Sequence, residues 1–156
     1  MSELADHTDE RTGRSHRSMK RLTRAIAAGI AATTVMSLML LMLEVQTRSE
    51  MEIFSVIARF IGTPNSPTIG FVLFAIAGSV AWPLLFLALE PYLPRGPDPA
   101  ARGVVFATIL WVPFVITGRG DISGPLVVLF GAYTLFAHWV YGFTLGAVYG
   151  RLSNQP

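Results

Sequence analysis

Residues 124–149 read GPLVVLFGAYTLFAHWVYGFTLGAVY, and this stretch decides the class of the fold. A helix rises about 1.5 Å per residue, so this run would be about 39 Å long, enough to cross a hydrocarbon core of about 30 Å. His138 is its only Asp, Glu, Lys, Arg or His. A run this long and apolar is typical of a transmembrane helix.

Three further apolar runs, at 22–43, 69–89 and 101–118, have the same character. Over all 156 residues, 52% are hydrophobic and only 14% are charged, against about 25% charged in soluble domains. We therefore predict an all-α integral membrane four-helix bundle, in which residues 21–151 form one domain. Pro83 and Pro113 each remove a backbone hydrogen bond inside a predicted span, so both spans should be kinked there.

Two segments outside the spans have a different composition. Residues 1–20 mix acidic and basic side chains without hydrophobic periodicity, which predicts a disordered charged tail. Residues 49–61 place apolar side chains on one helical face, which predicts a short amphipathic helix that lies in the membrane interface or caps the bundle. That face comprises Ile53, Phe54, Val56, Ile57, Phe60 and Ile61.

The basic residues are distributed unevenly about the four predicted spans. One side carries Arg11, Arg14, Arg17, Lys20, Arg21, Arg24, Arg95, Arg102 and Arg151, and the other carries Arg48, Arg59 and Arg119. This nine-to-three excess predicts that both termini are cytoplasmic and that the protein is a multi-pass protein of the cell membrane. Because the basic residues flank a span rather than form a groove, we expect no nucleic-acid partner.

No pattern in the chain indicates an enzyme. Cysteine is absent, and two of the three histidines, His7 and His16, lie in the tail. The chain therefore has no thiolate ligand and no pair of histidines within its spans, and we expect neither a metal nor another cofactor. No phosphate-binding, metalloprotease or serine-hydrolase motif is present, and no titratable residues are paired for catalysis.

His138 is a candidate intramembrane polar site, because ionisable groups inside spans are rare. At helical spacing its neighbours are small, so this face should meet another helix. The residue would be either a neutral imidazole hydrogen-bonded across that helix interface or a proton-relay group or lone axial ligand.

Small residues form a stripe along the last span. The candidate packing interface is Gly131, Gly142, Gly146 and Gly150, the last three in G-x-x-x-G-x-x-x-G spacing, which allows a close approach between helices. The stripe would pack inside the chain's own bundle, or would mediate homo-oligomerisation or docking onto a larger membrane subunit.

Charged residues at the span ends form a second candidate site. Glu44, Arg119 and Asp121 should share the outer side as a polar cluster, either as solvated helix caps or as a polar mouth that binds an ion or partner. Glu90 belongs to the cytoplasmic side, where Arg102 should extend outward from the third span.

Several segments carry a family resemblance: IARFIG at 57–62, AWPLLFLALEPYLPRGPDP at 81–99, GRGDISGP at 118–125 and AHWVYGFTLGAVYG at 137–150. The chain resembles small four-span membrane proteins of unknown function from halophilic archaea. The resemblance implies the fold, the membrane location and an accessory role near a respiratory oxidase. We expect a non-enzymatic accessory or assembly subunit of a membrane complex; the alternative is a small oligomeric transporter or channel that uses His138 and the proline-kinked spans.

Overall fold

A computed structural model of the chain describes residues 2–46, 53–94, 96, 98–118 and 123–154, and it has helices but no strands there. The elements are α1 (Ser2–Gln46), α2 (Ile53–Arg59), α3 (Pro67–Ile76), the π-helical segment η1 (Ala77–Ala81), α4 (Trp82–Leu89), the 3₁₀ turn η2 (Glu90–Tyr92), α5 (Pro99–Gly118) and α6 (Pro125–Ser153). The segments long and apolar enough to cross a membrane are Ser18–Leu43, Pro67–Tyr92, Pro99–Gly118 and Pro125–Ser153. The predicted all-α four-span bundle is confirmed.

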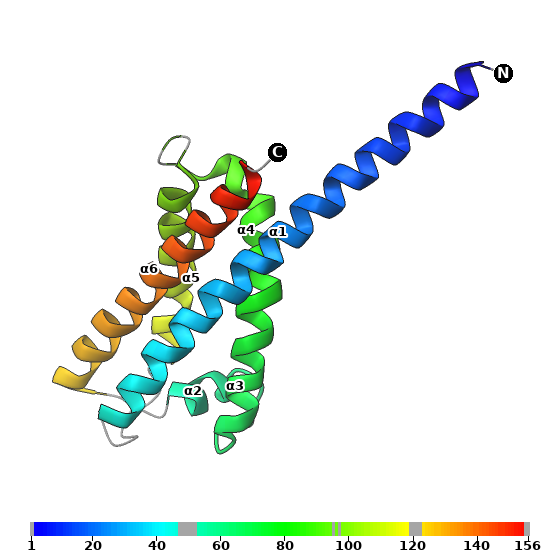
Figure 1. Cartoon of the computed structure of the whole chain (residues 1–156). Coiled ribbons are helices and arrows are strands. Elements are labelled where there is room, and N and C mark those ends of the chain that lie inside the picture. The colour runs from blue at the N-terminus through cyan, green and yellow to red at the C-terminus, as the bar shows by residue number, and fades with distance from the viewer. Residues whose placement is uncertain (1, 47–52, 95, 97, 119–122, 155–156) are drawn as a thin grey trace.

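The four spans lie side by side (Figure 1), and proline marks where three of them begin. Pro67, Pro99 and Pro125 are each the first residue of their helix, where a missing N–H has no intrahelical partner to lose. The contacts between elements place α6 between α5 and α1, and α1 between α6 and the second span.

Small side chains of α1 and aromatic rings of the other spans form the core. Ala25, Ala28 and Ala32 are fully buried at spacings of three and four residues, on the face that α1 turns to its neighbours. Toward the end of the bundle where α6 ends, the Phe86 ring of α4 lies 5.5 Å from Phe106 of α5 and 5.9 Å from Tyr149 of α6. Three spans therefore meet at Phe86.

Helix α2 caps one end of the bundle. Its Phe54 is buried and makes edge-on ring contacts with Phe71 and Phe74 of α3, while Phe60, just beyond the helix, stacks on Phe114 of α5. The structure thus has the helix over the end of the bundle, which is one of the two predicted positions. The helix ends at Arg59, two residues before the expected end at 61, and the expected start at 49 lies outside the described residues.

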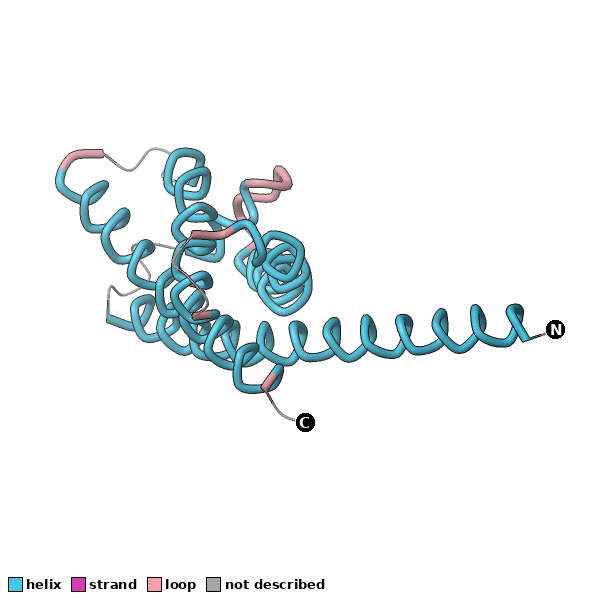
Figure 2. The backbone as a smooth tube through the Cα atoms, turned by 90° about the horizontal axis from the view of Figure 1, so that it is seen from above, coloured by secondary structure: helices cyan, strands magenta, loops and turns pink. Residues whose placement is uncertain are grey.

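The N-terminal segment differs from the expected disordered tail. Helix α1 begins at Ser2 and runs without interruption into the first span, so its N-terminal part projects from the bundle (Figures 1 and 2). The physical reason is cooperativity: the membrane span provides the helical nucleus, and each further residue then adds a hydrogen bond at little cost. Residues 1–20 also contain no proline to stop the helix.

Candidate functional site

His138 lies on α6, where its side chain is partly buried against α5. Its Nδ1–H donates to the carbonyl of Thr134, 2.7 Å away, and its ring centroid is 5.3 Å from that of Phe114. The bond of Nδ1 is therefore made within α6, to an acceptor four residues back, and the expected bond across a helix interface stays a prediction for the other ring nitrogen. With Nδ1 as donor, Nε2 of a neutral imidazole is an acceptor.

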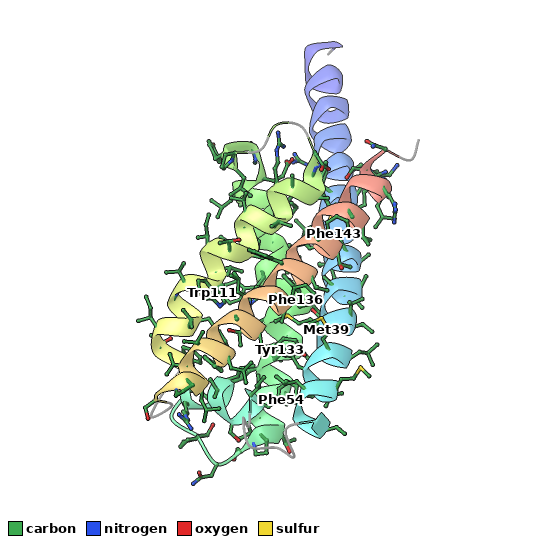
Figure 3. The ribbon with its side chains drawn as sticks, turned by 90° about the vertical axis from the view of Figure 1, so that its left-hand side faces the viewer. Met39, Phe54, Trp111, Tyr133, Phe136 and Phe143 are labelled. Atoms are coloured by element: carbon green, nitrogen blue, oxygen red, sulfur yellow. The ribbon has the colours of Figure 1, made fainter. Side chains whose placement is uncertain are left out.

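Two tryptophans connect α5 and α6 through hydroxyl groups. Trp111 Nε1 donates to Thr134 Oγ1 at 3.1 Å, and Trp139 Nε1 donates to Thr108 Oγ1 at 3.0 Å. Thr134 in turn donates to the carbonyl of Phe130 at 2.7 Å. Our sequence analysis missed both bonds, although an indole N–H within a span needs an acceptor from a neighbouring helix. Figure 3 shows Trp111 on α5 beside α6.

The second span departs from α-helical geometry just before Pro83. Trp82 N–H donates to the carbonyl of Ala77, five residues back, in the π-helical segment η1. In this π-helical register each N–H bonds to the carbonyl five residues back, so the carbonyl of Gly78 would accept from residue 83. Pro83 has no N–H to donate, and this bond is lost. The hydroxyl of Tyr141 on α6 donates to this carbonyl at 2.7 Å. A side chain from another span thus replaces the lost backbone bond.

Helix α1 packs closely against this break because Gly29 and Gly78 have no side chains. A Cβ on Gly29 would lie 2.8 Å from the carbonyl oxygen of Ser79, and one on Gly78 would lie 2.5 Å from Thr33 Oγ1. Thr33 is 6% exposed, and its hydroxyl has no hydrogen-bond partner among the described residues. The centre of the second span is therefore held between α1 and α6.

The two proline sites occupy different surroundings. Pro83 is fully buried, and a Cβ on Gly29 would overlap its ring, whereas Pro113 lies on the exposed face of α5. The prolines therefore do not line a common path within one chain.

The glycine stripe of α6 is covered by α5 of the same chain. A Cβ on Gly142 would overlap the carbonyl of Gly103, and one on Gly146 would overlap the carbonyl of Pro99. A Cβ on Gly150 would be 3.0 Å from the Pro99 ring, whereas at Gly131 the nearest atom would be 3.7 Å away. Of the two alternatives for this stripe, packing within the chain's own bundle is the one the structure has. In the folded chain α5 fills the space that a partner helix would need at Gly142 and Gly146.

The 90–102 loop is closed by an ion pair. Arg102 Nη1 contacts Glu90 Oε1, and Arg102 Nε donates to the carbonyl of Gly96 at 2.6 Å. Asp98 Oδ1 accepts the Ala100 N–H at 3.0 Å and so caps the start of α5. Arg102 was expected to extend outward from the third span; instead it pairs with Glu90, because the proline-rich turn returns the start of α5 to the first residue of η2.

The expected outer polar cluster lies outside the described part of the structure, since Arg119, Asp121 and the side chain of Glu44 are not among the described side chains. Within the ranges that are described, no three His, Asp or Glu residues come close enough together to hold a metal ion.

The geometry is that of a membrane bundle whose polar groups connect neighbouring helices, and a family comparison agrees with the extent of that bundle. Residues 19–156 match the model of a family of unknown function (DUF6789). The chain belongs to the DUF6789 family. The match covers the four candidate spans from Met19 onward and leaves out the projecting part of α1. Neither the curated proteins nor the solved structures contain a match to this DUF6789 chain.

Proposed function

We propose that this DUF6789 protein is a non-enzymatic accessory or assembly subunit of a larger membrane complex. Its polar groups within the membrane support this role, because they are used to hold helices together. Tyr141 bonds to the second span, and Trp111 and Trp139 join α5 to α6. Side chains committed in this way build a rigid body rather than a reaction centre.

The single observation that carries the proposal is the projection of α1. The helix begins at Ser2, whereas the candidate span begins at Ser18, so the segment 2–17 continues for about 24 Å beyond the span. The span nucleates this segment, but beyond the span no other helix of the bundle lies beside it (Figure 1). Its sequence carries acidic residues followed by basic residues. A projecting, charged helix fits a protein partner at the cytoplasmic face.

The covered glycine stripe also limits how a partner is bound. Gly142 and Gly146 face α5 of the same chain, so contacts within the membrane would use the lipid-facing sides of the spans. The projecting segment is then the main docking element, and the bundle serves as its membrane anchor.

Deletion of residues 2–14 tests this proposal, because it removes most of the projecting segment and keeps Lys20, Arg21 and Arg24 at the membrane. Mild-detergent extracts of native membranes are separated by native electrophoresis. We expect the full chain to migrate with a stoichiometric partner, and the deletion variant to migrate alone with an unchanged melting temperature. Haem absorbance of the co-migrating complex tests for a respiratory oxidase.

A point variant provides the matched control. Gly131→Ala alters the bundle at a position with space for a methyl group and should leave co-migration intact. The proposal is overturned if the full chain runs without any other protein, or if the deletion variant keeps its partner.

A further inference from the structure

A tyrosine bond fixes the register between α1 and α6. Tyr133 of α6 donates its hydroxyl to the carbonyl of Met39 on α1 at 2.9 Å, and the two residues lie together on neighbouring helices (Figure 3). The helices pack against each other and run in opposite directions (Figure 1). A residue of α1 that precedes Met39 by a given number of positions therefore lies at a similar level to the residue of α6 that follows Tyr133 by the same number.

Two arginines occupy equivalent positions relative to this bond. Arg21 precedes Met39 by 18 residues (39 − 21), and Arg151 follows Tyr133 by 18 residues (151 − 133). Eighteen residues are five full helical turns, about 27 Å. Each arginine thus lies on the same face of its helix as the bonded residue, and both reach the same end of the α1–α6 contact.

This position is the level of the lipid headgroups. Arg21 lies in the first turn of the span Ser18–Leu43, and Arg151 lies in the last turn of Pro125–Ser153. Both side chains are exposed. The carboxylates of the nearby 90–102 loop are already used: Glu90 contacts Arg102, and Asp98 accepts the N–H of Ala100. Among the described residues, neither of these loop carboxylates is paired with Arg21 or Arg151.

We propose that Arg21 and Arg151 bind the phosphate of an anionic phospholipid at the cytoplasmic end of the α1–α6 contact. Guanidinium groups bind phosphate oxygens through paired, directional hydrogen bonds. An acyl chain has an apolar surface to follow, because Phe136 and Phe143 of α6 are 56% and 57% exposed and lie on the side of the bundle that shows Met39 and Tyr133 (Figure 3). This surface favours a whole lipid over free phosphate.

The test measures lipid binding to the purified full chain in detergent, with phosphatidylglycerol as the probe and phosphatidylcholine as the neutral comparison. We expect phosphatidylglycerol to raise the melting temperature of the wild-type chain. In the Arg21→Gln/Arg151→Gln double variant its affinity should fall about a hundredfold, from about tenfold for each directed, charge-assisted hydrogen bond to the phosphate. Both arginines are exposed, so the double variant should fold.

Lys20→Gln is the matched control, because Lys20 is an exposed cation next to Arg21 but on a different face of α1. It should keep nearly the wild-type affinity, and so should Arg59→Gln at the end of α2. Equal losses in Lys20→Gln and the double variant would show a diffuse charge effect and overturn the site. An equal melting-temperature rise with inorganic phosphate at the same concentration would overturn the lipid as its occupant.

Discussion

At the scale of single residues, Pro83 and Tyr141 show how the chain tolerates a break inside the membrane. The proline leaves the carbonyl of Gly78 without its backbone donor, and the tyrosine hydroxyl provides another at 2.7 Å. In lipid no water is available for this task. From Pro83 the sequence predicts a lost backbone bond in this span, but it does not indicate that the replacement donor comes from the last span.

Tyr141→Phe should lower the free energy of unfolding by about 1 kcal/mol, because a buried carbonyl loses its only side-chain donor. In the Pro83→Ala background the loss should be smaller, since the restored N–H of residue 83 can reach Gly78. Unfolding of the four chains in mixed micelles gives the coupling energy. Tyr92→Phe is the control, because Tyr92 is 83% exposed. Strictly additive effects of the two substitutions would contradict the replacement of one donor by the other.

At the scale of elements, the glycines of α6 allow two backbones to approach closely. Gly142 and Gly146 face the carbonyls of Gly103 and Pro99, and rigid backbone atoms cannot rotate away from an added methyl group. The G-x-x-x-G spacing predicts a close helix contact, but it does not say which helix makes it. The antiparallel pairing with α5 follows from the short 119–124 connection and the absence of side chains on both surfaces.

Gly146→Ala should destabilise the bundle by about 1–3 kcal/mol through overpacking against Pro99. Gly131→Ala places the same methyl group on the same helix at ordinary contact distance from Val115, and it should be neutral, or stabilising by up to about 1 kcal/mol through helix propensity. Thermal unfolding of both variants in one detergent provides the comparison. Equal stabilities would show that α5 does not approach α6 at Gly146 as closely as the structure has it.

At the scale of the whole molecule, charge and shape give the bundle two different ends. One end carries α2, folded over α3 and α5, and the other carries the projecting segment of α1 with the closed 90–102 loop. The positive-inside rule predicts that the second end is cytoplasmic. The proposed docking of the projecting helix and the proposed lipid site both depend on this orientation.

Single cysteines test the orientation cleanly, because the chain contains none of its own. Asn65→Cys, in the exposed turn before α3, should react with a membrane-impermeant maleimide on intact cells. Asn154→Cys, just after α6, should react only after the membrane is permeabilised. Labelling is read on gels after purification, and the reverse pattern would place both termini outside.

The sequence by itself determined the class of the protein, its four spans and their approximate ends. Long runs such as 124–149 are stable only where backbone groups bond within a helix and side chains meet lipid, and prolines such as Pro67 mark where helices begin. Tertiary structure decided which helices touch, that α2 caps the bundle, that Arg102 pairs with Glu90, and that His138 bonds within its own helix. These outcomes depend on contacts between residues far apart in the chain, and local periodicity gives the direction of a helical face but not the identity of its neighbour.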